Sequence, residues 1–168
     1  MKFIKNFFFG VGILFFLSSC DPDTCKNVIC GEFGICEDGE CFCEEGYAKD
    51  DSGLCNLRFR DLVTGEWESS DLCDIAGAST DSVNISDDAN DINKVLITGW
   101  LGVSDSLVVT VSEYDYTISR QSPDNNNIFI EGTASYDLES DLMEWSYVIT
   151  DETNLPIIVD SCTATWTR

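Results

Sequence analysis

The sequence predicts an all-β protein in which a small disulfide-rich module precedes an eight-stranded antiparallel meander barrel. First, six cysteines fall within residues 25–55, a segment too short to bury an adequate apolar core, so disulfides must hold it together. Second, the chain after residue 63 is rich in Val, Ile, Thr, Tyr and Trp, and turn residues recur roughly every 8 to 14 positions. A β-sandwich is the alternative arrangement for these strands.

Residues 1–19 have the features of a secretory signal peptide. Lysines near the start precede an apolar run at residues 7–17, which is shorter than the roughly 20 residues of a membrane-spanning helix. The motif Leu17-Ser18-Ser19-Cys20 that ends this run resembles the lipobox of bacterial lipoproteins. That resemblance implies cleavage before Cys20, a diacylglyceryl group on its sulfur, and a short lipidated tether at residues 20–24. We expect this covalent lipid to attach the protein to a membrane, and we expect no other cofactor.

Two aspartates, Asp21 and Asp23, follow the expected lipidation site. Acidic residues at this place are similar to the signal that exports lipoproteins to the cell surface in some didermal bacteria. In other bacteria, an aspartate here retains the lipoprotein in the inner membrane. We expect an outer-membrane anchor with the protein on the cell surface, and the periplasmic face is the alternative.

The charge and composition of the chain exclude several functions. Nine Lys and Arg residues stand against 31 Asp and Glu residues, for a formal net charge of −22, which argues against nucleic-acid binding. The chain has no histidine, so Ser/His and Cys/His catalytic groups are excluded. Glu131 and Glu144 fall on neighbouring expected strands, but their alternation with apolar residues places both on the outer face. We therefore expect no enzymatic activity and no catalytic residues.

The six clustered cysteines follow the spacing C-x4-C-x5-C-x4-C-x-C-x11-C. Six cysteines allow 15 pairings. The spacing resembles that of the EGF-like domain over residues 25–55, and Gly46-Tyr47 before the last cysteine matches the end of that pattern. The resemblance implies the disulfides Cys25–Cys36, Cys30–Cys41 and Cys43–Cys55. Asp38-Gly39 is a signal for a two-residue hairpin turn inside this module.

Some EGF-like domains bind calcium through acidic residues that precede the first cysteine. Asp21 and Asp23 are the candidates for such a site, but Thr24 stands where the family has an acidic or amide residue. Calcium takes six to eight oxygen ligands. Since these two aspartates are the only ligands we can identify, we expect no metal site.

A connector at residues 56–63, with one expected helical turn, leads into the barrel domain at residues 64–168. Alternation is clear in the later strands, where Met143, Trp145 and Tyr147 share one face and polar residues share the other. We expect strands near residues 64–69, 81–86, 93–100, 107–113, 115–121, 128–136, 142–150 and 158–167.

The two remaining cysteines lie at opposite ends of this domain. Cys73 follows the first expected strand, and Cys162 lies in the last. A disulfide between them would tie together the two strands that must meet when a barrel closes. For a loop of this length, the chain-entropy model gives a stabilisation of about 4.5 kcal/mol.

The motif Gly65-Glu66-Trp67 on the first expected strand resembles the G-x-W signature of lipocalins and other calycins. In that family, the tryptophan plugs one end of the barrel, and a basic residue from the last strand packs over it. The resemblance implies that Arg168 is this basic residue and that residues 64–168 form a short calycin-like barrel.

Three inward-facing aromatic residues, Trp145, Tyr147 and Trp166, are the candidates for lining a ligand pocket, although inward aromatics also fill small barrels. We expect a lipid-anchored cell-envelope protein with a non-enzymatic binding or surface-display role. Its expected partner is an envelope or extracellular protein, or a glycan. The alternatives are a carrier of a small ligand or glycan in the barrel, and an inhibitor of an envelope protease or lysozyme.

Overall fold

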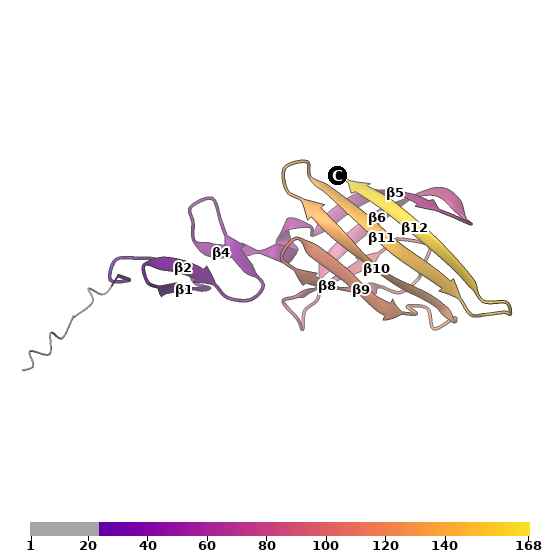
Figure 1. Ribbon diagram of the computed structural model, residues 1–168, viewed down its shortest axis with the longest axis horizontal. Coiled ribbons are helices and arrows are strands. Elements are labelled where there is room, and N and C mark those ends of the chain that lie inside the picture. Colours follow the sequence, from indigo (N-terminus) through magenta and orange to yellow (C-terminus); the bar gives the residue numbers. More distant parts are fainter. Residues whose placement is uncertain (1–23) are drawn as a thin grey trace, which may run out of the picture.

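The computed structural model describes residues 24–168. The expected signal peptide, the expected lipidation site Cys20 and the calcium candidates Asp21 and Asp23 all lie outside the described residues. Within residues 24–168, no helix is both long enough and apolar enough to cross a membrane. Two small sheets stand at one end of the described chain, and a large barrel stands at the other (Figure 1).

The cysteine-rich module consists of two hairpins. Strand β1 (Gly34–Glu37) pairs antiparallel with β2 (Glu40–Cys43), and β3 (Tyr47–Lys49) pairs with β4 (Cys55–Arg58). The β1–β2 turn has φ of 51° at Asp38 and 89° at Gly39, as a two-residue turn of this type requires. The structure joins the cysteine pairs that the resemblance implies, namely Cys25–Cys36, Cys30–Cys41 and Cys43–Cys55.

A single 3-10 turn, η1 (Phe59–Leu62), connects the module to the barrel. The Phe59 backbone N–H donates to the Gly46 carbonyl oxygen at 3.1 Å, and its ring meets the Tyr114 ring edge to face with centroids 5.6 Å apart. The Asn93 side-chain amide also donates to Glu45 Oε1 at 2.9 Å. Both the connector and the module therefore contact this end of the barrel.

Eight strands form the barrel, and each pairs antiparallel with its neighbours. The closure lies between the last strand and the first, where Cys162 is the register partner of Cys73. Because the sheet closes, the sandwich alternative does not apply. The barrel strands are β5 (Gly65–Cys73), β6 (Gly77–Asp87), β7 (Lys94–Thr98), β8 (Leu107–Ser112), β9 (Asp115–Gln121), β10 (Ile128–Asp137), β11 (Leu142–Asp151) and β12 (Ile158–Thr167).

The first barrel strand is longer than expected. The sequence predicted an end near residue 69, with Cys73 after the strand, but β5 continues to Cys73 itself. Ser69 and Asp71 are buried at positions that alternate with exposed residues. Both face the core, where the Ser69 hydroxyl and the buried Trp100 indole N–H donate to the Asp71 carboxylate.

The third barrel strand is shorter than expected, since β7 ends at Thr98 and not near residue 100. Gly99 follows it with φ of 82°, and an added Cβ there would lie 2.5 Å from the Ser82 carbonyl oxygen. This tight turn places Trp100 beyond the strand, where its side chain is fully buried in the core.

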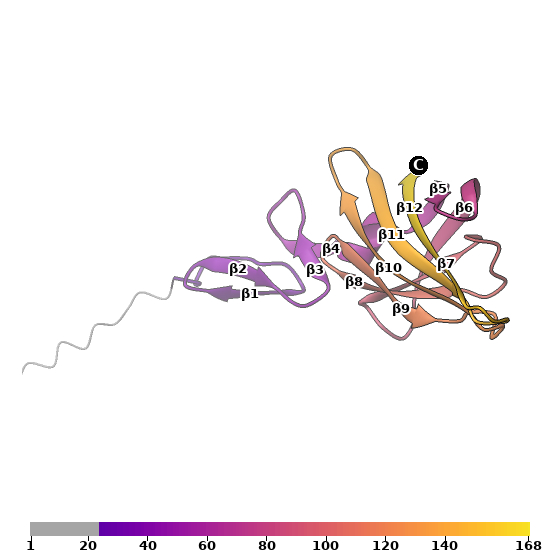
Figure 2. The ribbon, with the colours of Figure 1, turned by 45° about the vertical axis from the view of Figure 1, so that its right-hand side comes forward.

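The barrel has two distinct ends (Figure 2). The end next to η1 holds the β10–β11 loop and the C-terminal Arg168, which donates to the Leu62 carbonyl oxygen at 2.9 Å. The other end faces away from the cysteine-rich module and is called the distal end. It is formed by the four loops at residues 74–76, 99–106, 122–127 and 152–157.

Candidate functional site

The end of the barrel next to η1 is closed by the pair expected from the G-x-W signature. The Arg168 guanidinium carbon lies 4.4 Å from the centroid of the Trp67 ring, which is buried. The Trp67 indole N–H donates to the Val63 carbonyl oxygen at 2.7 Å. Gly65 begins the strand with φ of 129°, a conformation suited to glycine. These contacts close this end.

An ion pair holds the closing arginine in place. Arg168 donates to Asp141 Oδ1 at 2.6 Å and to the Tyr136 hydroxyl at 3.2 Å. The hydrogen bond from Arg168 holds the pKa of the Asp141 carboxyl below its usual value. Burial and the hydrogen bond to Asp141 raise the pKa of the Tyr136 phenol. The contacts of Arg168 with Asp141 and Tyr136 therefore have a structural role at this end.

The candidate ligand-lining residues meet in the middle of the barrel. Trp145, Tyr147 and Trp166 are all buried, and each packs against Trp100, with ring centroids 5.3, 4.8 and 4.8 Å from its ring. Trp145 and Trp166 also pack on each other at 5.2 Å. Trp100 meets Tyr147 and Trp166 edge to face, an arrangement that is favourable for buried aromatic rings, and the other two pairs are tilted. The four side chains fill this part of the interior with one another.

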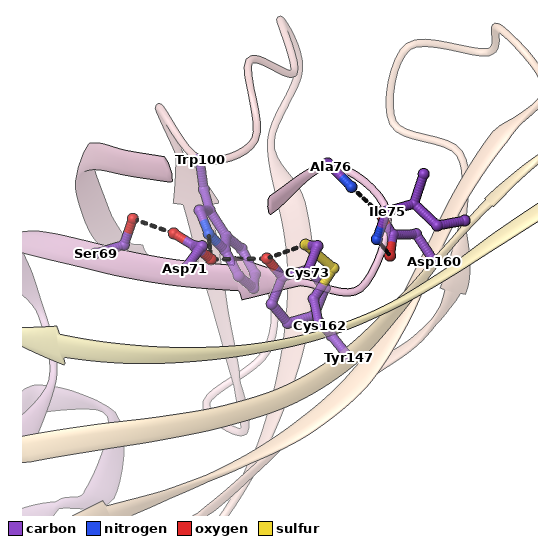
Figure 3. The surroundings of a disulfide bond; sticks show 9 residues. All are labelled: Ser69, Asp71, Cys73, Ile75, Ala76, Trp100, Tyr147, Asp160 and Cys162. Carbon is purple, nitrogen blue, oxygen red and sulfur yellow. Dashed lines mark hydrogen bonds between the residues drawn. A yellow bond between two sulfur atoms is a disulfide. The ribbon is translucent and has the colours of Figure 1, made fainter. Parts of the chain in front are cut away.

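A buried carboxylate lies beside the aromatic cluster (Figure 3). Asp71 Oδ1 accepts hydrogen bonds from the Trp100 indole N–H at 2.9 Å and from the Tyr147 hydroxyl at 2.7 Å. Its other oxygen accepts from the Ser69 hydroxyl at 2.7 Å. Burial, together with the hydrogen bond to Asp71, raises the pKa of the Tyr147 phenol above its usual range. These three donors supply the polar contacts that a buried carboxylate needs.

The fourth disulfide, Cys73–Cys162, lies next to this network (Figure 3). The carboxylate of Asp160 lies near the two sulfurs, so these three residues have the spacing of a metal-ligand cluster. Both sulfurs are used in the disulfide, however, and Asp160 accepts the backbone N–H groups of Ile75 and Ala76 at 2.9 Å each. Asp160 therefore fixes the β5–β6 turn against the start of β12.

The distal end carries a small apolar pocket of about 160 Å³. Six apolar side chains contribute to its walls, and they come from the 99–106 and 122–127 loops and from strands β10 and β11. The apolar lining residues are Leu101, Val103, Pro123, Ile128, Ile130 and Ile149. Pockets for drug-sized ligands are typically about 300 to 1,000 Å³. This pocket therefore suits a single apolar side chain better than a small-molecule ligand.

Exposed aliphatic side chains also lie at this end of the molecule, on the β5–β6 turn and on the loop and strand start that lead into β12. We call five of them the distal patch: Ile75, Leu155, Ile157, Ile158 and Val159. Leu155 is 88% exposed and Ile75 is 65% exposed. The backbone of Ile75 is held against Asp160 of β12, so the two hairpins that carry the patch lie together. A cluster of exposed apolar residues is typical of an interaction surface.

The distal end is also acidic. Asp74 is exposed beside the patch and Asp124 lines the pocket, while Glu152 forms an ion pair with Arg120 at 2.6 Å. Asp124 Oδ1 accepts the backbone N–H groups of Ser104 and Asp105, which shapes the loop next to the pocket. A pocket, an apolar patch and an acidic border together make this end the candidate functional site.

Other hollows in the described chain have a different character. One of about 560 Å³ lies between the module and the barrel, and polar side chains such as Glu45 and Asn93 contribute to its lining. Another lies on the outer wall and includes Glu144. Glu131 and Glu144 are both exposed on outer faces, as their alternation predicted.

Sequence reasoning found some parts of these sites and missed others. It placed Trp67 with Arg168 and Cys73 with Cys162, and the structure brings both pairs together. It missed Asp71, although this residue shares its alternation with Trp67 on the same strand. It also missed the distal pocket, whose walls come from segments far apart in the sequence.

Comparisons with known proteins add limited information. No family model matches the chain, and no curated protein matches it. A redesigned beta barrel, b11L5F_LGL, is 14% identical with a TM-score of 0.46, covering 66% of this chain and 94% of its own. The structure of EF1p2_mFAP2b bound to DFHBI is 16% identical with a TM-score of 0.47, covering 66% of this chain and 96% of its own. Similarity at this level says nothing about what this barrel binds.

Proposed function

We propose that the chain is a lipid-anchored cell-envelope protein with a non-enzymatic role, which displays its distal end to a protein partner. The observation that carries the proposal is that the distal end holds both the exposed aliphatic residues of the distal patch and a small pocket with mostly apolar walls. This surface lies at the end of the described chain farthest from the cysteine-rich module (Figure 1). In the sequence, the expected anchor directly precedes that module. With the anchor at one end and the recognition surface at the other, the protein would present its distal end away from the membrane to a partner.

The chemistry of the distal end favours a protein as the partner. Aliphatic side chains such as Leu155 and Ile157 gain free energy when another apolar surface covers them. The pocket accepts one apolar anchor residue, and such anchors carry much of the affinity in protein interfaces. The acidic border favours a partner with basic residues around its apolar contact. A second copy of this acidic surface would be repelled.

Site-specific photo-crosslinking in the cells that make the protein tests this role. A photoreactive amino acid at Leu155 should form one discrete protein adduct, and the same group at Thr133 on the outer wall should not. Adding Ile157→Asp should abolish the adduct at Leu155. In the complex, the aspartate carboxylate would be buried against the apolar surface of the partner without a hydrogen-bond partner. Absence of a discrete adduct at Leu155, or an adduct unaffected by Ile157→Asp, would refute the proposed function.

A further inference from the structure

The cysteine-rich module carries its own unpartnered apolar surface. Ile35 of β1 and Phe42 of β2 are register partners across the hairpin, and they are 53% and 49% exposed. The half-buried cysteines Cys36 and Cys41 alternate with them and point to the opposite face. The exposed pair is thus a face of the hairpin that the disulfides do not cover.

This face lies close to the point where the described chain begins. An added Cβ on Gly39, in the β1–β2 turn, would lie 3.5 Å from both Thr24 Cβ and the Thr24 carbonyl oxygen. The pair of Ile35 and Phe42 stands three residues from the turn on each strand, which is about 10 Å along the hairpin. The described chain therefore starts at the turn end of this hairpin, about 10 Å along it from the exposed apolar pair, and the Cys25–Cys36 disulfide ties that start to the opposite face of β1.

The tether that precedes Thr24 is very short. Four residues separate the sulfur-bearing Cys20 from Cys25, and the five residue steps between these two cysteines span at most about 18 Å. The polar headgroup layer on each side of a bilayer is roughly 5 to 8 Å thick. A lipid on Cys20 would therefore hold the β1–β2 hairpin at the membrane surface.

We infer that the face formed by Ile35 and Phe42 rests in the interface of the bilayer that holds the anchor, an inference that depends on the proposed lipid anchor. Partly exposed aromatic and aliphatic side chains gain free energy when they enter this layer. Glu37 and Glu40 are register partners next to the pair, and their negative charges would be repelled by anionic lipids. We therefore expect the hairpin to contact a membrane of zwitterionic lipids. The hairpin contact then orients the barrel with its distal end away from the membrane.

Fluorescence quenching on vesicles tests this contact. The full lipidated chain, with dansylalanine placed at Phe42 and in separate samples at Ile35 or Leu155, is reconstituted in phosphatidylcholine vesicles containing doxyl-labelled lipid. Near-ultraviolet circular dichroism and disulfide mapping check that each sample is folded. The probes at Phe42 and Ile35 should be quenched, and the probe at Leu155, 88% exposed at the distal end, should not.

The mass of the same samples shows whether the chain carries the lipid, so failure of the proposed anchor can be distinguished from failure of the proposed membrane contact. A lipidated protein without quenching at Phe42 and Ile35 refutes the membrane contact and leaves the anchor intact. Equal quenching at Leu155 also refutes the proposed orientation. A mature chain without the lipid refutes the anchor, and with it this contact. Quenching confined to the hairpin supports the contact.

Discussion

Removal of the buried carboxylate of Asp71 should destabilise the barrel strongly. In Asp71→Ala, the Trp100 indole N–H and the Tyr147 hydroxyl both lose their acceptor while they remain buried. Each unsatisfied buried donor costs about 1 to 3 kcal/mol, so the variant should lose about 4 kcal/mol of unfolding free energy. Ser69 loses less, because its hydroxyl still accepts the Asp81 backbone N–H at 3.1 Å.

Two companion variants show whether the loss of stability comes from the lost hydrogen bonds. One removes the negative charge of Asp71 but keeps an acceptor oxygen, and the other changes an exposed residue of the same strand. Asp71→Asn keeps an oxygen for both aromatic donors and should cost about 1 kcal/mol or less. Ser70→Ala, exposed on the same strand, should stay within about 0.5 kcal/mol of the parent protein. Urea unfolding followed by tryptophan fluorescence, with the disulfides intact, measures all three. If Asp71→Ala costs no more than Ser70→Ala, the proposed role of the network is wrong.

Three further predictions concern the rest of the barrel. Replacing Cys73 and Cys162 together by alanine should lower the unfolding free energy by about 4.5 kcal/mol, given the 89-residue separation, and an unchanged urea midpoint would contradict this. Arg168→Ala should lower the unfolding free energy by about 2 kcal/mol in the same assay. Arg168→Lys should recover less than half of this loss, because lysine cannot stack on Trp67 and also donate several hydrogen bonds to Asp141 as a guanidinium does. Full recovery in Arg168→Lys would show that charge alone matters. Burial raises the pKa of Tyr116, so above about pH 10 the unfolded chain loses a proton that the folded protein keeps, and stability should fall as pH rises; Tyr116→Phe should make this fall less steep, and an identical pH profile would contradict the prediction.

The sequence predicted the parts of the fold that depend on local pattern. Cysteine spacing and strict alternation depend on short stretches of chain, so the barrel and most strand positions could be predicted from them. β5 and β6 extend farther toward the distal end than expected, and the extension of β5 was missed because Ser69 and Asp71 look like turn residues when they are read alone. The inward position of Asp71 depends on donors at Trp100 and Tyr147, which lie on other segments and become neighbours only in the folded barrel.

The candidate site was harder to predict for the same reason. The apolar residues in the loop at 155–157 carry no motif, and an exposed leucine in a turn has no meaning until its surroundings are known. The pocket beside them joins Leu101 to Ile128 and Ile149 across three separate segments. In contrast, the contact between Trp67 and Arg168 was expected from the resemblance of Gly65-Glu66-Trp67 to a G-x-W motif.

Antibody labelling of intact cells tests the central claim most directly. Antibodies raised against the folded protein are applied to cells before and after the outer membrane is permeabilised, with a periplasmic protein as the control. Display on the cell surface predicts equal labelling in both states, while the control is labelled only after permeabilisation. Labelling of this protein only after permeabilisation would place it inside the envelope and contradict the proposed display of its distal end.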